Sequence, residues 1–230
     1  AICEHPGIDA VTFVGSTRVA KIVYRKASGN FKRVLCLGGA KNHLIVLPDA
    51  NEEMTATNVA ASMTGCAGQR CMAAAAMVAV GNTDSIINSL CKEVKKIVPG
   101  KNLGAVISKQ AQERIEGYIT DAESEGAKIL VDGRGVNVKG KKNGYYVGPT
   151  VLDCVTPDMK IAKEEVFGPV LAIMRADTVD EALKIENKSP YGNAASVFTQ
   201  SGSLANYVTE RASSGMIGVN IGVPVPREPF

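Results

Sequence analysis

Short apolar runs alternate with longer amphipathic segments along most of the chain. The segment 85–97 shows the helical pattern most clearly, because its apolar residues recur three or four positions apart. Further helices are expected at about 18–27, 51–62, 109–124, 179–187 and 204–212. Strands are expected at 10–14, 33–37, 43–47, 74–80, 129–131, 145–152, 170–174, 194–198 and 216–220. Strands that alternate with helices of this length predict an α/β fold with a mostly parallel sheet.

The turn formed by Gly15, Ser16 and Thr17 joins the first of these strands to the first helix. A strand, a tight turn and a helix start can aim free backbone N–H groups at an anion. An ordinary helix cap by the hydroxyl of Ser16 or Thr17 explains the same residues. The local sequence leaves both interpretations open.

The run MTGCAGQRCMAAAAM, residues 63–77, places Cys71 in a glycine-containing turn after one amphipathic segment. A thiolate in such a turn can act as a nucleophile, because neighbouring backbone N–H groups can bind an oxyanion. The alternative is an ordinary buried cysteine.

Composition narrows the class of protein. Hydrophobic residues make up 45% of the 230 positions and charged residues 21%, which is typical of a globular protein with a core. The net charge is only +3, and the densest basic cluster, 139–142, is interrupted by Gly140, which favours a solvated hairpin tip. No stretch approaches the roughly 18 apolar residues of a membrane span. We therefore expect neither a nucleic-acid nor a membrane partner.

The six cysteines are scattered without a CxxC pair, and His5 and His43 are the only histidines. This pattern predicts no metal site and favours a reducing compartment. No GxGxxG occurs, so the usual dinucleotide fingerprint is absent from this chain.

The chain opens on Ala1 in a segment typical of the middle of a domain and closes on a proline-rich arm at 223–230. We expect it to be a piece of a larger polypeptide.

Four short segments in a fixed order carry a resemblance to a known family. They are Phe13-Val14-Gly15-Ser16-Thr17, Leu37-Gly38-Gly39-Ala40-Lys41, Gly68-Gln69-Arg70-Cys71 and Glu164-Glu165-Val166-Phe167-Gly168-Pro169. Together they resemble the aldehyde dehydrogenase superfamily over essentially the whole chain. The segments 39–43, 68–73 and 219–226 resemble its CoA-acylating branch most.

The resemblance implies a role for each matching residue. Cys71 would be the nucleophile and would carry a thioester after hydride transfer to NAD. The turn at Gly15 and Ser16 would lie at the cofactor pyrophosphate, and Gly38 would also belong to the cofactor-binding residues. Glu165 would bind the nicotinamide ribose and Phe167 would pack near the ring. From the residues alone, Glu165 is equally a surface acid and Phe167 a core aromatic.

One departure from the family bears on the fate of the thioester. Hydrolytic members carry a glutamate general base, and the family spacing puts that position at Leu37, thirty-four residues upstream of Cys71. Leucine cannot activate water, and Cys36 should point to the opposite face of the strand. The resemblance therefore implies acyl transfer to coenzyme A.

Arg70, beside the nucleophile, would hold a substrate carboxylate; the alternative is a structural arginine. The implied substrate is methylmalonate or malonate semialdehyde, whose thioester can lose CO2 before transfer and give propionyl-CoA or acetyl-CoA. Two alternatives stay open: a hydrolytic aldehyde dehydrogenase with another base, and a catalytically inactive fragment.

The resemblance also predicts the organisation of the molecule. Residues 1–36 would be the end of an NAD-binding domain and residues 37–230 a catalytic domain lacking its own C-terminal end. Lys41 is interpreted as structural and His43 as a core or edge histidine. The full-length enzyme is expected to form homo-oligomers in the cytoplasm of a bacterium or the mitochondrial matrix of a eukaryote.

Overall fold

The computed structural model describes residues 1–141 and 143–223 and contains two compact units, Ala1–Ala40 (unit 1) and Lys41–Phe230 (unit 2). The boundary lies four residues beyond the expected division between 36 and 37. The reason is that the Gly39 N–H donates to Thr17 Oγ1 at 3.0 Å, which ties the end of this segment to unit 1. The roles expected for the two parts stay predictions.

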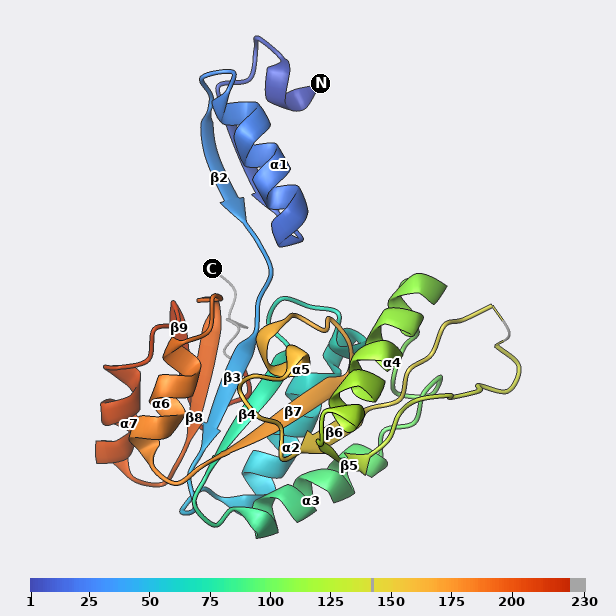
Figure 1. Ribbon diagram of the computed structural model, residues 1–230, viewed down its shortest axis with the longest axis vertical. Helices are drawn as coiled ribbons and strands as arrows, with labels where there is room; N and C mark the ends of the chain where they lie inside the picture. The colour runs from blue at the N-terminus through green and yellow to red at the C-terminus, as the bar shows by residue number, and fades with distance from the viewer. Residues whose placement is uncertain (142, 224–230) are drawn as a thin grey trace. The chain divides into compact units, whose positions relative to one another are not determined.

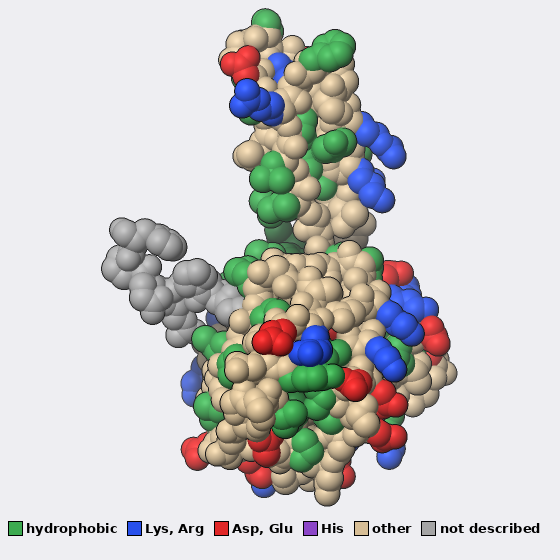
Figure 2. Space-filling view, turned by 90° about the vertical axis from the view of Figure 1, so that its left-hand side faces the viewer, with side chains coloured by type: hydrophobic (Ala, Val, Ile, Leu, Met, Phe, Trp, Pro, Cys, Tyr) green, Lys and Arg blue, Asp and Glu red, His purple; other side chains and the backbone are tan. Residues whose placement is uncertain are grey.

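Unit 1 is a small βαβ unit (Figure 1). It contains η1 (Ile2–Glu4), β1 (Ala10–Val14), α1 (Thr17–Ser28) and β2 (Arg33–Leu37). The strands pair in parallel, with Val14 opposite Leu37. Half-buried and exposed residues alternate along β2, so Cys36 and Leu37 point to opposite faces, as predicted. Hydrophobic side chains lie at the surface of this unit (Figure 2). Those more than half exposed are Ile2, Val14, Ile22, Tyr24, Phe31, Leu35 and Leu37.

Unit 2 is built on a seven-stranded sheet with the order β5-β6-β7-β4-β3-β8-β9. Its strands are β3 (Asn42–Val46), β4 (Ala74–Val80), β5 (Lys128–Val131), β6 (Thr150–Asp153), β7 (Val170–Ala176), β8 (Ala194–Phe198) and β9 (Met216–Val219). Its helices are α2 (Glu52–Thr64), η2 (Gly65–Gly68), α3 (Asp84–Lys95), α4 (Lys109–Ser124), α5 (Lys160–Lys163), α6 (Val179–Asn187) and α7 (Gly202–Thr209). Only β5 pairs antiparallel, which confirms the predicted α/β class with a mostly parallel sheet.

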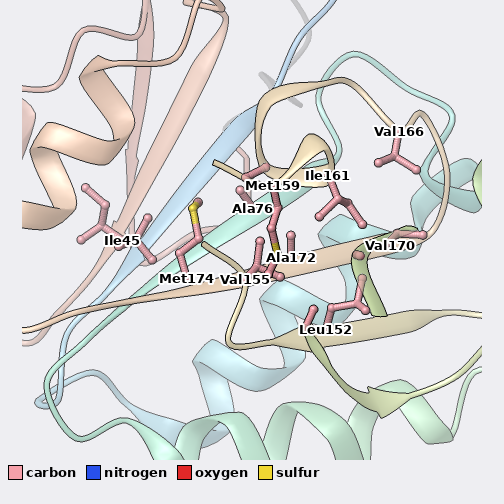
Figure 3. Packing of buried hydrophobic residues seen from close by; sticks show 14 of the residues in the cluster. Ile45, Ala76, Leu152, Val155, Met159, Ile161, Val166, Val170, Ala172 and Met174 are labelled. Carbon is pink, nitrogen blue, oxygen red and sulfur yellow. The ribbon is translucent and has the colours of Figure 1, made fainter. Parts of the chain in front are cut away.

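Helices cover both faces of this sheet, so every residue of β3 is buried. Leu44 and Val46 pack with side chains of α2 and α3 on one face. Ile45 and Leu47 belong to the cluster on the other face, which includes residues of α4, α5, α6 and α7. Figure 3 shows part of that second cluster, with Ile45 on β3, Met174 and Ala172 on β7 and Ile161 on the segment that contains α5.

The strand expected at 145–152 is wrong over most of its length, because β6 covers only Thr150–Asp153. The preceding residues make loop contacts instead: Tyr145 pairs with Val106 in an isolated bridge, and the Gly148 N–H donates to Gly133 O at 2.8 Å. Pro149 has no N–H with which to join the hydrogen-bond ladder of a sheet.

Position 142 of the basic cluster and positions 224–230 of the proline-rich arm lie outside the described residues. Among the described helices, none combines the length and apolarity that crossing a bilayer requires.

Candidate active site

The candidate residues of unit 2 gather at one edge of its sheet. Asn42 is the first residue of β3, Cys71 lies three residues before β4, Phe167 three before β7, and Asn193 directly before β8. These four strands are adjacent and parallel, so their amino ends meet at the same edge. Residues far apart in the sequence are thereby brought to one place.

The turn that carries Cys71 reverses the chain between α2 and β4. Cys66 and Ala67 have φ near +53° and Gly68 has φ +69°, so three successive residues are left-handed. The left-handed conformation favours glycine at position 68. The packing requires glycine there as well, because a Cβ would lie 2.0 Å from the carbonyl oxygen of Gly168. This contact places the Gly68–Cys71 motif directly against the Glu164–Pro169 motif.

Cys71 itself is exposed, which makes the buried-cysteine interpretation wrong. Its carbonyl oxygen accepts hydrogen bonds from Nδ2 of Asn42 at 2.8 Å and Nδ2 of Asn193 at 3.0 Å. Within the described part of the chain, the Cys71 N–H donates to no protein acceptor. The thiol, and a backbone donor beside it, are therefore both available to a substrate.

Gln69 fixes the outer side of the same turn. Its Oε1 accepts from the Ile107 N–H at 2.9 Å, and its Nε2 lies 3.4 Å from the carbonyl oxygen of Ala105. The turn is thus held by the 105–107 loop as well as by the sheet edge.

The Arg70 guanidinium lies over Gly65, where a Cβ would come within 2.6 Å of Arg70 Cζ. Its Nη2 donates to Ser62 O at 3.1 Å, while its buried Nε has no partner. It also lines a cavity of about 220 Å³, whose other lining residues are Asn58, Ala61, Ser62, Ile221, Gly222 and Val223. No carboxylate pairs with Arg70 among the residues the structure describes. A guanidinium that lines a cavity and pairs with no carboxylate could hold an anionic group, while its bond to Ser62 O fits the structural role equally well.

The loop that carries Glu165 and Phe167 is held by hydrogen bonds from three side chains. Arg114 Nη1 donates to Val166 O at 2.5 Å, and Tyr118 donates to Glu164 Oε2 at 2.5 Å. Burial of the phenol and this bond to Glu164 raise the pKa of Tyr118 to about 12. Phe167 is left-handed, with φ +51°, and 39% exposed, so the core-aromatic interpretation is wrong. Glu165, beside it, is half-buried.

Lys41 provides the third tie to this loop. Its buried ammonium donates to Ile161 O at 2.6 Å and to Glu164 O at 3.0 Å. Burial lowers the pKa of Lys41 to about 8, although the carboxylates of Glu165 and Glu164 act in the opposite direction. The structural interpretation of Lys41 is therefore supported by its geometry.

His43 points to the α4–α7 side of the sheet and is buried. Burial and the neighbouring Lys41 charge lower the pKa of His43 to about 4, so it is neutral near pH 7. It lines a cavity of about 590 Å³ together with Lys163 and Lys188. This places it as a core histidine, as expected from the sequence.

The remaining candidates, Gly15, Ser16 and Gly38, belong to unit 1. Ser16 occupies the N-cap position of α1, but its side chain makes no capping hydrogen bond. Thr17 Oγ1 is turned toward the Gly38–Gly39 segment, where a Cβ on Gly38 would come within 2.9 Å of it. The hydroxyl-cap explanation of this turn is thus wrong. The first-turn N–H groups of α1 are left without a capping side chain, as an anion site requires.

Asn42 and Asn193 were not predicted as functional residues. Asn42 lies within the segment 39–43, which carries part of the family resemblance. The sequence around an asparagine at the start of a buried strand does not show which groups its side-chain amide will contact. Asn193 follows Gly192 in a loop and is 122 residues from the atom that it binds. Among the described residues, no group of three or more His, Cys, Asp or Glu side chains could hold a metal ion.

The fold and the residues of this site agree with one protein family. The aldehyde dehydrogenase family model matches residues 1–230, and the chain belongs to this family. A probable acylating methylmalonate-semialdehyde/malonate-semialdehyde dehydrogenase of Drosophila melanogaster, described as mitochondrial, is 46% identical over 226 residues, which are 96% of this chain and 44% of that protein. The human protein described by the same activity is 42% identical over 226 residues, 96% of this chain and 42% of that protein.

The comparison with solved structures finds proteins described by the same activity. A protein from Sinorhizobium meliloti, described as a putative methylmalonate-semialdehyde dehydrogenase complexed with NAD, superposes with a TM-score of 0.94 at 42% identity, covering 98% of this chain and 48% of that one. The methylmalonate-semialdehyde dehydrogenase of Oceanimonas doudoroffii gives 0.94 at 41% identity, with the same two coverages. The chain therefore spans less than half the length of these relatives.

Proposed function

We propose that this chain supplies the thiol centre of an NAD-dependent, CoA-acylating dehydrogenase of methylmalonate or malonate semialdehyde. The observation that carries the proposal lies at the sheet edge: Cys71 is exposed and has a free backbone N–H, and the residue before it, Arg70, lines a cavity without a carboxylate partner among the described residues. The names of the relatives support the choice of substrate.

In the first step the Cys71 thiolate adds to the aldehyde carbon, and the carbonyl electron pair becomes an oxyanion. The Cys71 N–H can donate to that oxygen. The carbon then gives up a hydride, the oxyanion electrons re-form the C=O bond, and a thioester remains on Cys71.

The residues present fit a dinucleotide. In unit 1, the start of α1 after Gly15 and Ser16, which has no capping side chain, suits a pyrophosphate. In unit 2, Glu165 would bind ribose hydroxyls and Phe167 would pack near the nicotinamide. When bound, NAD accepts the hydride.

Arg70 would hold the substrate carboxylate through its unused N–H donors. In the thioester that carboxylate is β to the carbonyl, so the C–C bond can break to release CO2, with its electron pair held in a thioester enolate. A proton from solvent completes a propionyl or acetyl thioester. The CoA thiol then attacks this carbonyl and Cys71 leaves as thiolate. Leu37 favours this outcome because it cannot activate water for hydrolysis.

The experiment compares two proteins: the chain alone, and the chain grafted in place of the matched segment of the Drosophila relative. Each is given NAD and methylmalonate semialdehyde, with and without CoA, while NADH and the acyl product are measured. We expect the graft to form propionyl-CoA only with CoA present, and Cys71→Ala to abolish it while Cys154→Ala, at an exposed thiol outside the turn, does not. Free acid formed equally fast without CoA would establish the hydrolytic alternative, and no turnover in the graft would establish an inactive segment.

A second arm tests the carboxylate clamp. In Arg70→Gln we expect kcat/KM to fall about thirtyfold for methylmalonate semialdehyde, the size of a lost charge-assisted hydrogen bond. Turnover of propanal, which has no carboxylate, should be nearly unchanged. Equal losses for both aldehydes would assign Arg70 a structural role.

We further propose that the full-length enzyme is a homo-oligomer, mitochondrial in a eukaryote and cytoplasmic in a bacterium. Mass photometry of the graft and of the parent relative tests the first part.

A further inference from the structure

The carbonyl oxygen of Cys71 is bound by two side-chain amides that come from different strands. Asn42, at the start of β3, donates through Nδ2 to Cys71 O at 2.8 Å and to Ala73 O at 2.7 Å. Asn193, before β8, donates to Cys71 O at 3.0 Å. A carbonyl has two lone pairs, so these bonds use the whole acceptor capacity of this peptide group.

The two amides also hold each other. Asn193 Nδ2 lies 3.3 Å from Asn42 Oδ1 and 3.1 Å from the sulfur of Met72. Asn42 is 2% exposed, and a shift in strand register separates it from His43. From this position the Asn42 side chain reaches the cysteine turn, where it makes its two hydrogen bonds. We define these two residues as the amide pair.

Binding at this carbonyl has two physical consequences for the adjacent thiol. It fixes the peptide plane between Cys71 and Met72, and with it the direction of the Cys71 Cα–Cβ bond. It also places N–H dipoles against the negative end of the peptide dipole, which would otherwise oppose a thiolate on the same residue. The sheet edge alone supplies neither effect.

We propose that the amide pair is a positioning device for the Cys71 nucleophile, in which Asn42 and Asn193 hold the peptide carbonyl of Cys71 so that its thiolate is oriented and electrostatically favoured. This inference rests on the proposed role of Cys71. The pair does not contact the reacting atoms, so both asparagines are positioning residues. Asn193 is the better position to test, because it is half-buried whereas Asn42 lies in the core.

The test uses the chain itself and needs no turnover. Alkylation by iodoacetamide is followed from pH 6 to 10, with Cys71 and Cys66 quantified separately by peptide mass spectrometry. Cys66 is an exposed thiol on the same turn and serves as an internal reference. The variants are Asn193→Ala, which removes the donor, and Asn193→Asp, which keeps the shape but places a carboxylate against the carbonyl and near the thiolate.

We expect the Cys71/Cys66 rate ratio at pH 7.5 to fall about threefold in Asn193→Ala and about tenfold in Asn193→Asp. The matched control is Asn187→Ala, which removes an amide that donates to Arg211 O at 3.0 Å, far along the chain from the cysteine turn. Its ratio should equal that of the unmodified chain.

An unchanged ratio in Asn193→Ala would overturn the proposal, as would equal changes at Cys66 and Cys71, because those outcomes describe a structural contact only. Failure of the proposed function is a separate result. Loss of CoA-dependent turnover in the graft leaves the alkylation profile of the chain untouched, and the profile alone decides the amide pair.

Discussion

Two turns carry the candidate chemistry of this chain, and they are held in opposite ways. The cysteine turn of unit 2 is fixed by contacts from remote elements: Asn193 binds Cys71 across 122 residues, and Gly168 packs on Gly68. The glycine turn of unit 1 is fixed locally, by a bond from the Gly15 N–H to Leu37 O at 3.2 Å and one from the Gly39 N–H to Thr17.

The difference follows from what each turn has to do. A nucleophile must place one sulfur atom accurately, which a turn of left-handed residues cannot do without outside support. An anion site needs only several N–H groups pointing the same way, and the start of a helix supplies these by itself. We therefore expect the cysteine turn to be much less tolerant of substitution than the glycine turn.

Gly68→Ala should have the largest effect. The new Cβ would overlap the backbone at Gly168, within 2.0 Å of its oxygen and 2.2 Å of its carbon, at a φ of +69°. Overpacking against backbone and the left-handed conformation together should cost about 4 kcal/mol of unfolding free energy. Urea unfolding followed by circular dichroism measures this. The control is Gly117→Ala in α4, where the Cβ meets nothing within 4 Å and stability should rise slightly. Equal effects of the two substitutions would contradict the close contact.

Lys41 gives a pH dependence to the stability of the loop that carries Glu165 and Phe167, beside the cysteine turn. Its pKa is about 8 when folded and 10.5 in the reference state, so between these values the unfolded chain binds more protons. The Lys41 contribution to stability is therefore fully present above pH 10.5 and is lost as pH falls through 8. Between these two limits the free energy of unfolding changes by roughly 3 kcal/mol.

The measurement compares urea unfolding of the chain with that of Lys41→Met from pH 7 to 10. Subtracting the variant removes the titration of other groups. The stability of the chain should rise with pH relative to Lys41→Met. A difference that stays flat over this range would show that Lys41 is not buried as a cation.

Gln69→Ala tests the outer side of the cysteine turn. It removes the acceptor for the Ile107 N–H and the donor to Ala105 O, both in exposed surroundings, and should cost about 1 kcal/mol. Gln69→Glu keeps the acceptor and should recover part of the loss. Hydrogen exchange of the peptide covering 103–108 provides the local readout, and unchanged exchange in Gln69→Ala would exclude this contact.

Gly38→Ala, in the glycine turn, should have the smallest effect. Its Cβ would meet Thr17 Oγ1 at 2.9 Å and Thr17 Cα at 3.2 Å, so Thr17, which also accepts the Gly39 N–H, has to shift, but Gly38 has no positive φ. We expect a cost of about 0.5 kcal/mol, seen as slightly faster hydrogen exchange in α1. A loss as large as that of Gly68→Ala would abolish the contrast between the two turns.

Most of the secondary structure could be predicted from the sequence, because apolar periodicity reports burial directly. β4, α4, α6 and β8 have the predicted bounds. The strand at 145–152 was mistaken because Tyr145, Tyr146 and Val147 are apolar enough for a strand, while the backbone at Gly148 bonds to Gly133 instead. Apolar composition shows that a segment is buried but does not show what its backbone pairs with.

The sequence by itself determined the family, the α/β class, and the residue types that can do the chemistry: a thiol at 71, a guanidinium at 70, glycines at 15 and 38, and no general base at 37. The tertiary structure decided which of them meet. Asn42, Cys71, Phe167 and Asn193 come together only because β3, β4, β7 and β8 are adjacent and parallel, so that their amino ends share an edge. Strand order depends on the packing of both sheet faces against helices, and no local pattern of residues encodes it.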